Sequence, residues 1–369
     1  MTHIVNDRNS EGRRHPSART RLFMAAGITL ASSFTIGVLG ASAADAPLML
    51  EKTMIIPGVP VSPYSDVLSV DVAGARVFAT PQAAKAVAVL DIKDGHVLKM
   101  ITGMGKLHAV FYSPKLNRLF VTDAAAGDMK VFDGKDYSLI KSIPLAVGAD
   151  TLVYDPRSQL IYVNSGGEDA GMDHAIVSVV DPARMEKVSD IPIAAKDLEG
   201  SVVDPEKQLL YVALVADFAV AVVDLHTGKT VANWKLPEGK NSPFALEVDA
   251  ARNRLYVTCR VDNAGFGIGG RFFAIDTQSG RVMKTMSIGG WADGISLDKK
   301  RQRIYISTGV GRIESYAVEG NDVYRRLADV ETPLISKHSL YSAELDRLLV
   351  DVPHLALTEA QVLVFKPLP

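Results

Sequence analysis

The chain has 369 residues, and its 40 Lys and Arg against 42 Asp and Glu give a formal net charge of −2. This balance supplies no obvious basic face, so a nucleic-acid partner bound through its phosphates is not expected. Cys259 is the single cysteine, which excludes an intrachain disulfide and leaves stability to the hydrophobic core. The cysteine follows Tyr256-Val257-Thr258 in a predicted strand, where a free thiol is expected to be buried.

The first 43 residues are predicted to be a secretory signal peptide. Five arginines between Arg8 and Arg21 form a basic segment, residues 22–40 are apolar, and Ala41-Ser42-Ala43 provides the small residues that precede a cleavage site. Residues 44–369 then form a single domain without a membrane span, and the protein is expected to be periplasmic or secreted. An uncleaved membrane anchor is the alternative, because the apolar segment is near the length that crosses a bilayer.

One short sequence pattern recurs seven times after residue 66: a turn residue followed by a bulky residue seven positions later. The turn residues are Asp71, Ser113, Asp155, Asp204, Asp249, Asp298 and Ser342, and their bulky partners are Phe78, Phe120, Tyr162, Tyr211, Tyr256, Tyr305 and Leu349. Successive partners are 42 to 49 residues apart, a period typical of propellers and other repeat folds.

Each repeat is predicted to contain four short strands. In the third repeat an apolar run at 151–154 meets the turn Asp155-Pro156, and a β-rich run follows at 159–163. A second hairpin comes next, and its first strand ends at an Asp in five repeats. Because helical periodicity is absent, the sequence predicts an all-β fold, a seven-bladed β-propeller of four-stranded antiparallel blades. The last repeat lacks a fourth strand, and the segment near 49–56 is expected to supply it and close the ring.

Several of these phrases resemble the repeat of the YVTN family of bacterial β-propellers. They include Arg254-Leu255-Tyr256-Val257-Thr258, Gln159-Leu160-Ile161-Tyr162-Val163-Asn164 and the run from Ile275 to Val282. The resemblance covers nearly the whole chain after the signal peptide. It implies an exported, usually non-catalytic protein with relatives among the propeller lactonases. Blades six and seven depart from the pattern, with Ala317 and Lys366 where the other five have the second Asp.

Aligning the repeats also predicts a ring of equivalent residues at the mouth of the central channel, five positions before each turn residue. The ring residues are Asp66, His108, Asp150, Glu199, Phe244, Asp293 and Lys337. Asp150, Glu199 and Asp293 are candidate ligands of a divalent cation, with His108 and the neighbouring His338 as further ligands or bases. Trp291, beside Asp293, could form an apolar wall. The alternative is that these side chains bind loop backbones and face water.

Loop lengths single out blades three, five and seven as extended on the same face. The blade-three extension carries Glu168, Asp169, Asp173 and His174, a weaker set of candidate metal ligands. The blade-five extension at 262–271 is rich in glycine, but a strand follows it where a phosphate cradle needs a helix, so a flap is expected.

No known catalytic motif is present, such as Gly-x-Ser-x-Gly or His-Glu-x-x-His. The sequence therefore favours a binding or scaffold propeller, expected to be a monomer, that presents its loop face to a small ligand or a periplasmic protein partner. It requires no cofactor, although a divalent cation could bind. Two alternatives remain open: a metal-assisted hydrolase of the lactonase type, and a structural subunit of a periplasmic oxidoreductase.

Overall fold

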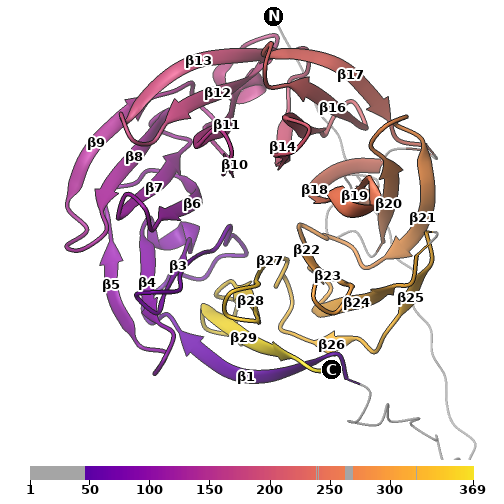
Figure 1. Ribbon diagram of the computed structural model, residues 1–369. Coiled ribbons are helices and arrows are strands. Elements are labelled where there is room, and N and C mark those ends of the chain that lie inside the picture. The colour runs from indigo at the N-terminus through magenta and orange to yellow at the C-terminus, as the bar shows by residue number, and fades with distance from the viewer. Residues whose placement is uncertain (1–45, 238, 240, 262–268, 321) are drawn as a thin grey trace, which may run out of the picture. The chain divides into compact units, whose positions relative to one another are not determined.

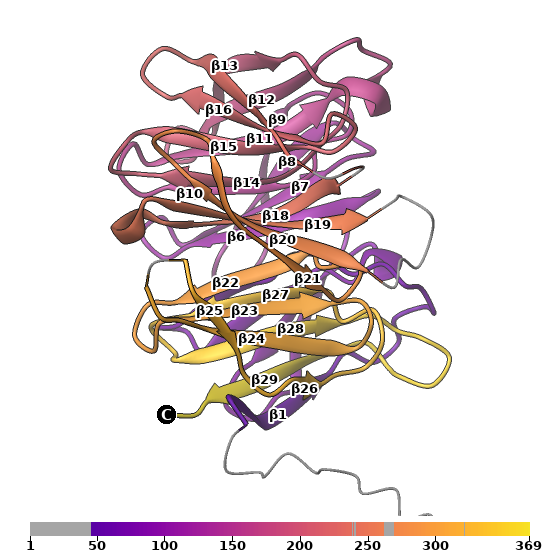
Figure 2. The same ribbon diagram turned by 90° about the vertical axis from the view of Figure 1, so that its right-hand side faces the viewer.

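The computed structural model describes residues 46–369 except 238, 240, 262–268 and 321. Its strands form seven antiparallel sheets that stand around a central channel (Figure 1). Seen from the edge in Figure 2, the strands of successive blades lie in tilted layers. The prediction of an all-β, seven-bladed propeller is confirmed.

Five blades each use four consecutive strands, with the innermost strand first in the chain. Blade one contains β2 (Ser69–Asp71), β3 (Arg76–Ala79), β4 (Val87–Asp91) and β5 (Val97–Ile101), and blade two contains β6 (Leu107–Ser113), β7 (Arg118–Asp123), β8 (Asp128–Asp133) and β9 (Leu139–Pro144). Blade three contains β10 (Leu152–Asp155), β11 (Leu160–Gly166), β12 (Ala175–Asp181) and β13 (Glu186–Ile193), and blade four contains β14 (Leu198–Asp204), β15 (Leu209–Leu214), β16 (Ala219–Asp224) and β17 (Lys229–Lys235). Blade five contains β18 (Asn241–Asp249), β19 (Arg254–Val261), β20 (Gly270–Asp276) and β21 (Val282–Ile288).

Blade six differs at its outer edge, which is shared by two short strands that both pair with the third strand. Its strands are β22 (Gly294–Asp298), β23 (Arg303–Thr308), β24 (Arg312–Val318), β25 (Tyr324–Arg326) and β26 (Val330–Glu331). The described residues also include three 3-10 turns, η2 (Gln82–Ala84), η3 (Gly167–Ala170) and η4 (Ala250–Arg252). In this part of the chain no helix has both the length and the apolar character that crossing a bilayer requires.

The seventh blade joins the two ends of the propeller. It contains β27 (His338–Ser342), β28 (Arg347–Val352) and β29 (Gln361–Pro367), and β1 (Leu48–Ile55) pairs antiparallel with β29 as the fourth strand (Figure 1). Met54 of β1 is fully buried among side chains of blades one and seven. The N-terminal strand therefore closes the ring as predicted, and it removes an unpaired sheet edge.

The invariant seven-residue spacing has a local cause in the inner hairpin of each blade. In all seven repeats the turn residue accepts a hydrogen bond from an amide two or three residues ahead. The fourth residue after it adopts a left-handed conformation, with φ between 48° and 60°; these residues are Ala75, Asn117, Gln159, Gln208, Asn253, Gln302 and Asp346. The bulky partner comes three residues later and is at most 4% exposed. A fixed turn thus delivers one large side chain to each interface between blades.

Candidate ligand-binding site at the channel mouth

All seven ring residues lie at the start of their inner strands, and therefore at one end of the channel. Asp66, Asp150, Asp293 and Lys337 stand in the entry loops just before β2, β10, β22 and β27. His108, Glu199 and Phe244 instead fall where the pairing register shifts, between Leu107 and Val110, Leu198 and Ser201, and Pro243 and Ala245. Such irregularities re-aim a side chain out of the regular pleat.

Close approach of the inner strands explains the small residues that follow the ring positions. A Cβ atom on Gly200 would lie 2.3 Å from the carbonyl oxygen of Phe244 in the next blade. That distance is shorter than any real contact, so only glycine fits. The inner strands of blades four and five therefore converge closely, and side chains at the mouth of the channel are brought together.

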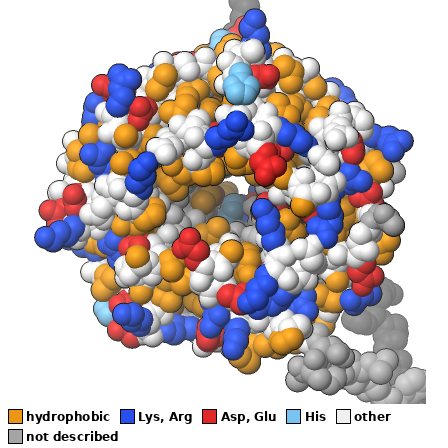
Figure 3. All heavy atoms as spheres, in the orientation of Figure 1, with side chains coloured by type: hydrophobic (Ala, Val, Ile, Leu, Met, Phe, Trp, Pro, Cys, Tyr) orange, Lys and Arg blue, Asp and Glu red, His pale blue; other side chains and the backbone are white. Residues whose placement is uncertain are grey.

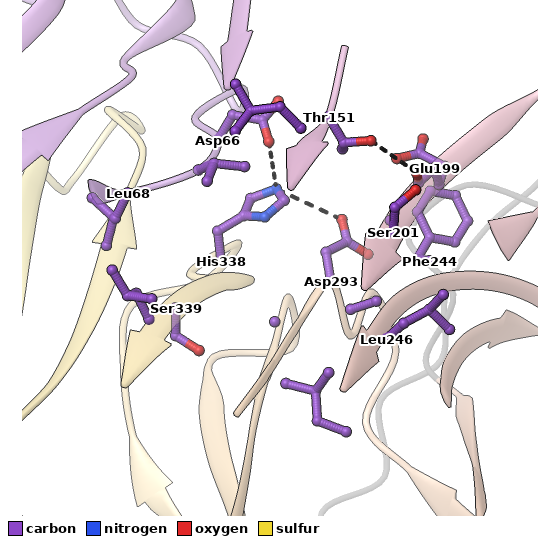
Figure 4. A pocket seen from close by; sticks show the side chains of 17 residues that line it. Asp66, Leu68, Thr151, Glu199, Ser201, Phe244, Leu246, Asp293, His338 and Ser339 are labelled. Carbon is purple, nitrogen blue, oxygen red and sulfur yellow. Dashed lines mark hydrogen bonds and ion pairs between the residues drawn. The ribbon is translucent and has the colours of Figure 1, made fainter. Parts of the chain in front are cut away.

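A cavity of about 460 Å³ occupies this mouth. It is lined by Tyr64, Ser65, Asp66, Gln82, Lys106, His108, Asp150, Glu199, Arg260, Asp293, Lys337 and His338. A second cavity of about 280 Å³ lies between the inner strands, where Leu68, Leu152, Leu246, Ile295 and Leu340 add an apolar lining (Figure 4). The central opening of the ring is visible in Figure 3. A charged entrance that leads to a partly apolar channel has the character of a small-molecule site.

Asp66, His108 and Asp150 form a tight cluster on the side of blades one to three. His108 Nδ1 lies 2.9 Å from Asp66 Oδ2 and 3.4 Å from Asp150 Oδ2, and Gln82 Nε2 donates to Asp66 Oδ2 at 2.9 Å. Burial opposes protonation of the imidazole, but the hydrogen bond to Asp66 and the charges of both carboxylates outweigh it and raise the pKa of His108. One ligand atom from each of the three residues lies within 4.8 Å of the others, so this cluster could hold a metal ion.

Asp293 is held by two cations from neighbouring blades. Arg260 approaches it with Nε at 3.1 Å and Nη2 at 2.5 Å, and Lys337 Nζ lies 2.5 Å from Oδ2. Burial opposes ionisation, but these two cations keep the pKa of Asp293 far below its usual range. The guanidinium also lies 3.5 Å from the ring centroid of Phe244 and 5.4 Å from that of Trp291. Two positive charges therefore surround one carboxylate.

His338 bridges the two groups, as Figure 4 shows. Its Nε2 lies 3.5 Å from Asp66 Oδ1 and 3.9 Å from Asp293 Oδ2. Burial, reinforced by the charge of Lys337, lowers the pKa of His338 to about 4. The imidazole is therefore uncharged at neutral pH, and it could donate or accept a hydrogen bond without adding charge to the cavity.

Asp150 and Glu199 differ from Asp293 because neither is held by Arg or Lys; Asp150 lies 3.4 Å from His108 Nδ1, which it shares with Asp66. Among the described residues the Glu199 carboxylate has no hydrogen-bond or ion-pair partner, and burial together with the charges of Asp150 and Asp293 raises its pKa well above the ordinary value. Burial and the neighbouring charges of Asp66 and Asp169 raise the pKa of Asp150 to about 7, although His108 opposes this. Glu199 is therefore unpartnered among the described residues, and Asp150 is only partly compensated, by His108.

A third cavity, of about 300 Å³, adjoins the mouth beside blade three and shares His108, Asp150 and Glu199 with it. It brings in Glu168 and Asp169 of the blade-three extension, so two sets of residues that were predicted separately meet here. The extension is fixed by hydrogen bonds from Gly166 N to Val147 O and from Glu168 N to Lys196 O, both 2.9 Å long.

Other predicted residues lie elsewhere or serve as support. Asp173 is 94% exposed and pairs with His174 at 2.7 Å, so these two do not join the cavity. The Trp291 ring contacts the cations of Arg260 and Lys337 and is not part of the lining of the mouth cavity. Most of the blade-five extension, residues 262–268, lies outside the described residues.

Sequence reasoning missed several lining residues that other rows of the repeat alignment could have revealed. Gln82 and Arg260 each stand four positions after the bulky residue of their blade, Gln82 in the 3-10 turn after β3 and Arg260 near the end of β19. Tyr64, Lys106 and Asp197 each stand two positions before a ring residue. The ring of predicted residues is therefore one of three rows that converge on the channel mouth.

Fold and site together define a class: a seven-bladed β-propeller with a charged cavity at one mouth of its channel. No protein-family model and no curated protein matches the sequence. Among solved structures, the chain is similar to one in Kuenenia stuttgartiensis hydrazine synthase, with 18% identity over 84% of this chain and 98% of that one and a TM-score of 0.68. It is also similar to a chain of the mitotic checkpoint complex, with 12% identity over 95% and 99% and a TM-score of 0.69. These likenesses show the propeller fold alone.

Proposed function

We propose that this protein is an exported binding propeller that takes a small ligand with a positively charged group at the channel mouth. The observation that carries the proposal is Glu199, a buried acid that lines the mouth cavity without a hydrogen-bond or ion-pair partner among the described residues, beside Asp150, which shares the single imidazole of His108 with Asp66. Burial disfavours the ionised form of such an acid, and a cationic ligand group beside it would stabilise the carboxylate, with release of the proton to solvent. The basic segment and apolar run of the first 43 residues and the resemblance to the YVTN family support export to the periplasm or the exterior.

Calorimetric titration of the purified protein with small primary and quaternary amines tests the proposal. At least one amine should bind, and Glu199→Gln should weaken it about tenfold to a hundredfold, because a charge-assisted contact contributes about 1.5–3 kcal/mol. Glu206→Gln is a matched control, since it removes an exposed carboxylate from the same blade at the opposite end of β14. If Glu206→Gln weakens binding as much as Glu199→Gln does, the proposed site is wrong.

Metal-assisted hydrolysis is a second candidate function, favoured by the Asp66, His108 and Asp150 cluster. Two carboxylates and one imidazole within 4.8 Å suit a divalent cation such as zinc and leave positions open. A bound ion would supply Lewis-acid activation of a carbonyl group or of water. Of the chain's own residues, neutral His338 could then move a proton, and Arg260 with Lys337 could orient a negatively charged substrate. Elemental analysis and a lactone panel test this function; a metal-free protein inert on every lactone would refute it.

A protein partner could occupy the same loop face, since propellers commonly mediate protein interactions. A structural subunit of a periplasmic oxidoreductase is the third alternative. It rests on the sequence resemblance to the YVTN family and on the similarity to a chain of hydrazine synthase, which is limited to the fold. Purification from the native source would test both, because either function requires a stoichiometric partner. A coloured partner would support the oxidoreductase role, and a monomer without one would argue against both.

A further inference from the structure

The charges around the mouth cavity are separated into two halves. Asp150 and Glu199, from blades three and four, form an acidic half. Arg260 and Lys337, from blades five and seven, form a basic half and exceed the single charge of Asp293 by one. Asp66 and His108 pair with each other, His108 also lies 3.4 Å from Asp150, and the exposed side chain of Lys106 completes the charged lining. A ligand that carries only a cation would match the acidic half and leave the basic half unmatched.

The basic half retains hydrogen-bond donors that the protein itself does not use. Arg260 contacts Asp293 through Nε and Nη2, which leaves Nη1 without a hydrogen-bond partner in the described part of the chain. Lys337 Nζ has three donors and donates one hydrogen bond to the described residues, to Asp293. Stacking on Phe244 and Trp291 holds the guanidinium in place. A planar anionic group such as a carboxylate suits these donors.

The ring geometry places Lys337 across the channel from Asp150 and Glu199, whereas Arg260 belongs to blade five, the neighbour of blade four. In a ring of seven, blade seven lies opposite blades three and four, and Figure 1 shows β27 facing β10 and β14 across the opening. Figure 4 shows Glu199 on the other side of the channel from His338, which follows Lys337. The cavity between them, about 460 Å³, falls within the range of roughly 300–1,000 Å³ usual for small-molecule sites.

We propose that the ligand is a small zwitterion, whose ammonium group contacts Glu199 and Asp150 and whose carboxylate contacts Lys337 and Arg260 across the mouth. Any apolar part of the ligand would enter the channel between Leu68, Leu246 and Leu340. This inference rests on the proposed function, because it assigns a second charged group to the same ligand. Free amino acids and betaines are the chemical class that it names.

The test compares ligands that differ by one charged group. The protein is titrated calorimetrically with the common free amino acids, glycine betaine and γ-aminobutyrate, and the best amino acid is then compared with its decarboxylated amine and its deaminated acid. For leucine these are 3-methylbutylamine and 4-methylpentanoate. The zwitterion should bind about tenfold or more tightly than either, because each lost charged contact weakens binding by at least that factor.

Two substitutions separate the halves of the site. Lys337→Met should weaken the zwitterion about tenfold or more without weakening the amine, whereas Glu199→Gln should weaken both. Lys337→Arg should retain most of the affinity for the zwitterion. Lys135→Met is the matched control, because it removes an exposed lysine of blade two. Circular dichroism and a thermal melt verify that each variant is folded.

The outcomes distinguish this inference from the proposed function. If amines bind as tightly as zwitterions and Lys337→Met changes neither affinity, the inference that the ligand is a zwitterion is wrong and the proposed function stands. If neither amines nor zwitterions bind to the folded protein, both are wrong. If the acid binds as well as the zwitterion and Glu199→Gln has no effect, the site recognises anions and both proposals fail.

Discussion

Replacing Asp351 by Asn should stabilise the protein at pH 8 and leave its stability almost unchanged at pH 4. Asp351 lies in β28 of the closing blade and is 2% exposed. Ser65, in the loop that leads from β1 into blade one, donates a hydrogen bond to its Oδ2. Burial, together with the charge of Asp66 and against the hydrogen bond from Ser65, raises the pKa of Asp351 to about 7 from a usual value of 3.8.

The size and the sign of the effect follow from this raised pKa. Between pH 3.8 and 7 the folded protein binds more protons at Asp351 than the unfolded chain, so its contribution to stability is full below pH 3.8 and is lost as pH rises through 7. The loss is about 4 kcal/mol above pH 7, since a tenfold change in the acid dissociation constant corresponds to about 1.36 kcal/mol. Asn can still accept the hydrogen bond from Ser65 and cannot ionise.

Urea unfolding of Asp351→Asn and of the unchanged chain at pH 4, 5, 6, 7 and 8 measures the difference in the free energy of unfolding. That difference should grow steadily with pH and level off near pH 8. Glu359→Gln removes an exposed carboxylate from the same blade and should show no such trend. A difference for Asp351→Asn that is independent of pH, or a variant less stable than the unchanged chain at pH 8, would refute the reasoning.

Three further predictions concern closure of the ring, the site cations and the thiol. Met54→Ala should lower the free energy of unfolding, measured with urea, by about 2–5 kcal/mol, because the side chain is fully buried between β1 and its neighbours. Leu50 lies in the same strand and is 51% exposed, so Leu50→Ala should change this free energy by less than about 0.5 kcal/mol. Arg260→Gln should raise the pKa of Asp293. The depressed pKa of Asp293 contributes stability that is present above the normal pKa of Asp and is lost as pH falls. In the variant this contribution should be smaller by about 1.5–3 kcal/mol and should be lost at a higher pH. An acid-unfolding midpoint that does not move would contradict this. Cys259 is fully buried and its thiol pKa is raised by burial, so a thiol reagent should label it only in denaturant; rapid labelling of the folded protein would contradict the structure.

The fold could be predicted from the sequence because it depends on interactions between residues that are close together in the chain. The turn residue, the left-handed residue four positions later and the bulky residue three positions after that are neighbours in the chain, so their spacing records the hairpin directly. The missing fourth strand of the last repeat could be inferred for the same reason, because each blade needs the same number of strands.

The candidate site could be predicted only in part from the sequence. Equivalent positions in the repeats identified Asp66, His108, Asp150, Glu199 and Asp293, because a ring of identical blades brings equivalent positions together. The alignment could not tell that Asp293 is compensated by two cations while Glu199 has none. Nor did it reveal the bulge that turns Glu199 into the mouth.

By itself, therefore, the sequence determined the number of blades, the closure of the ring and the end of the channel where charged residues gather, since these follow from repetition along the chain. Only the tertiary structure decided which charges are matched and which remain available to a ligand. Compensation of a charge depends on distances of a few ångströms between side chains of different blades, such as Arg260, Asp293 and Lys337, and no spacing in the sequence encodes those distances.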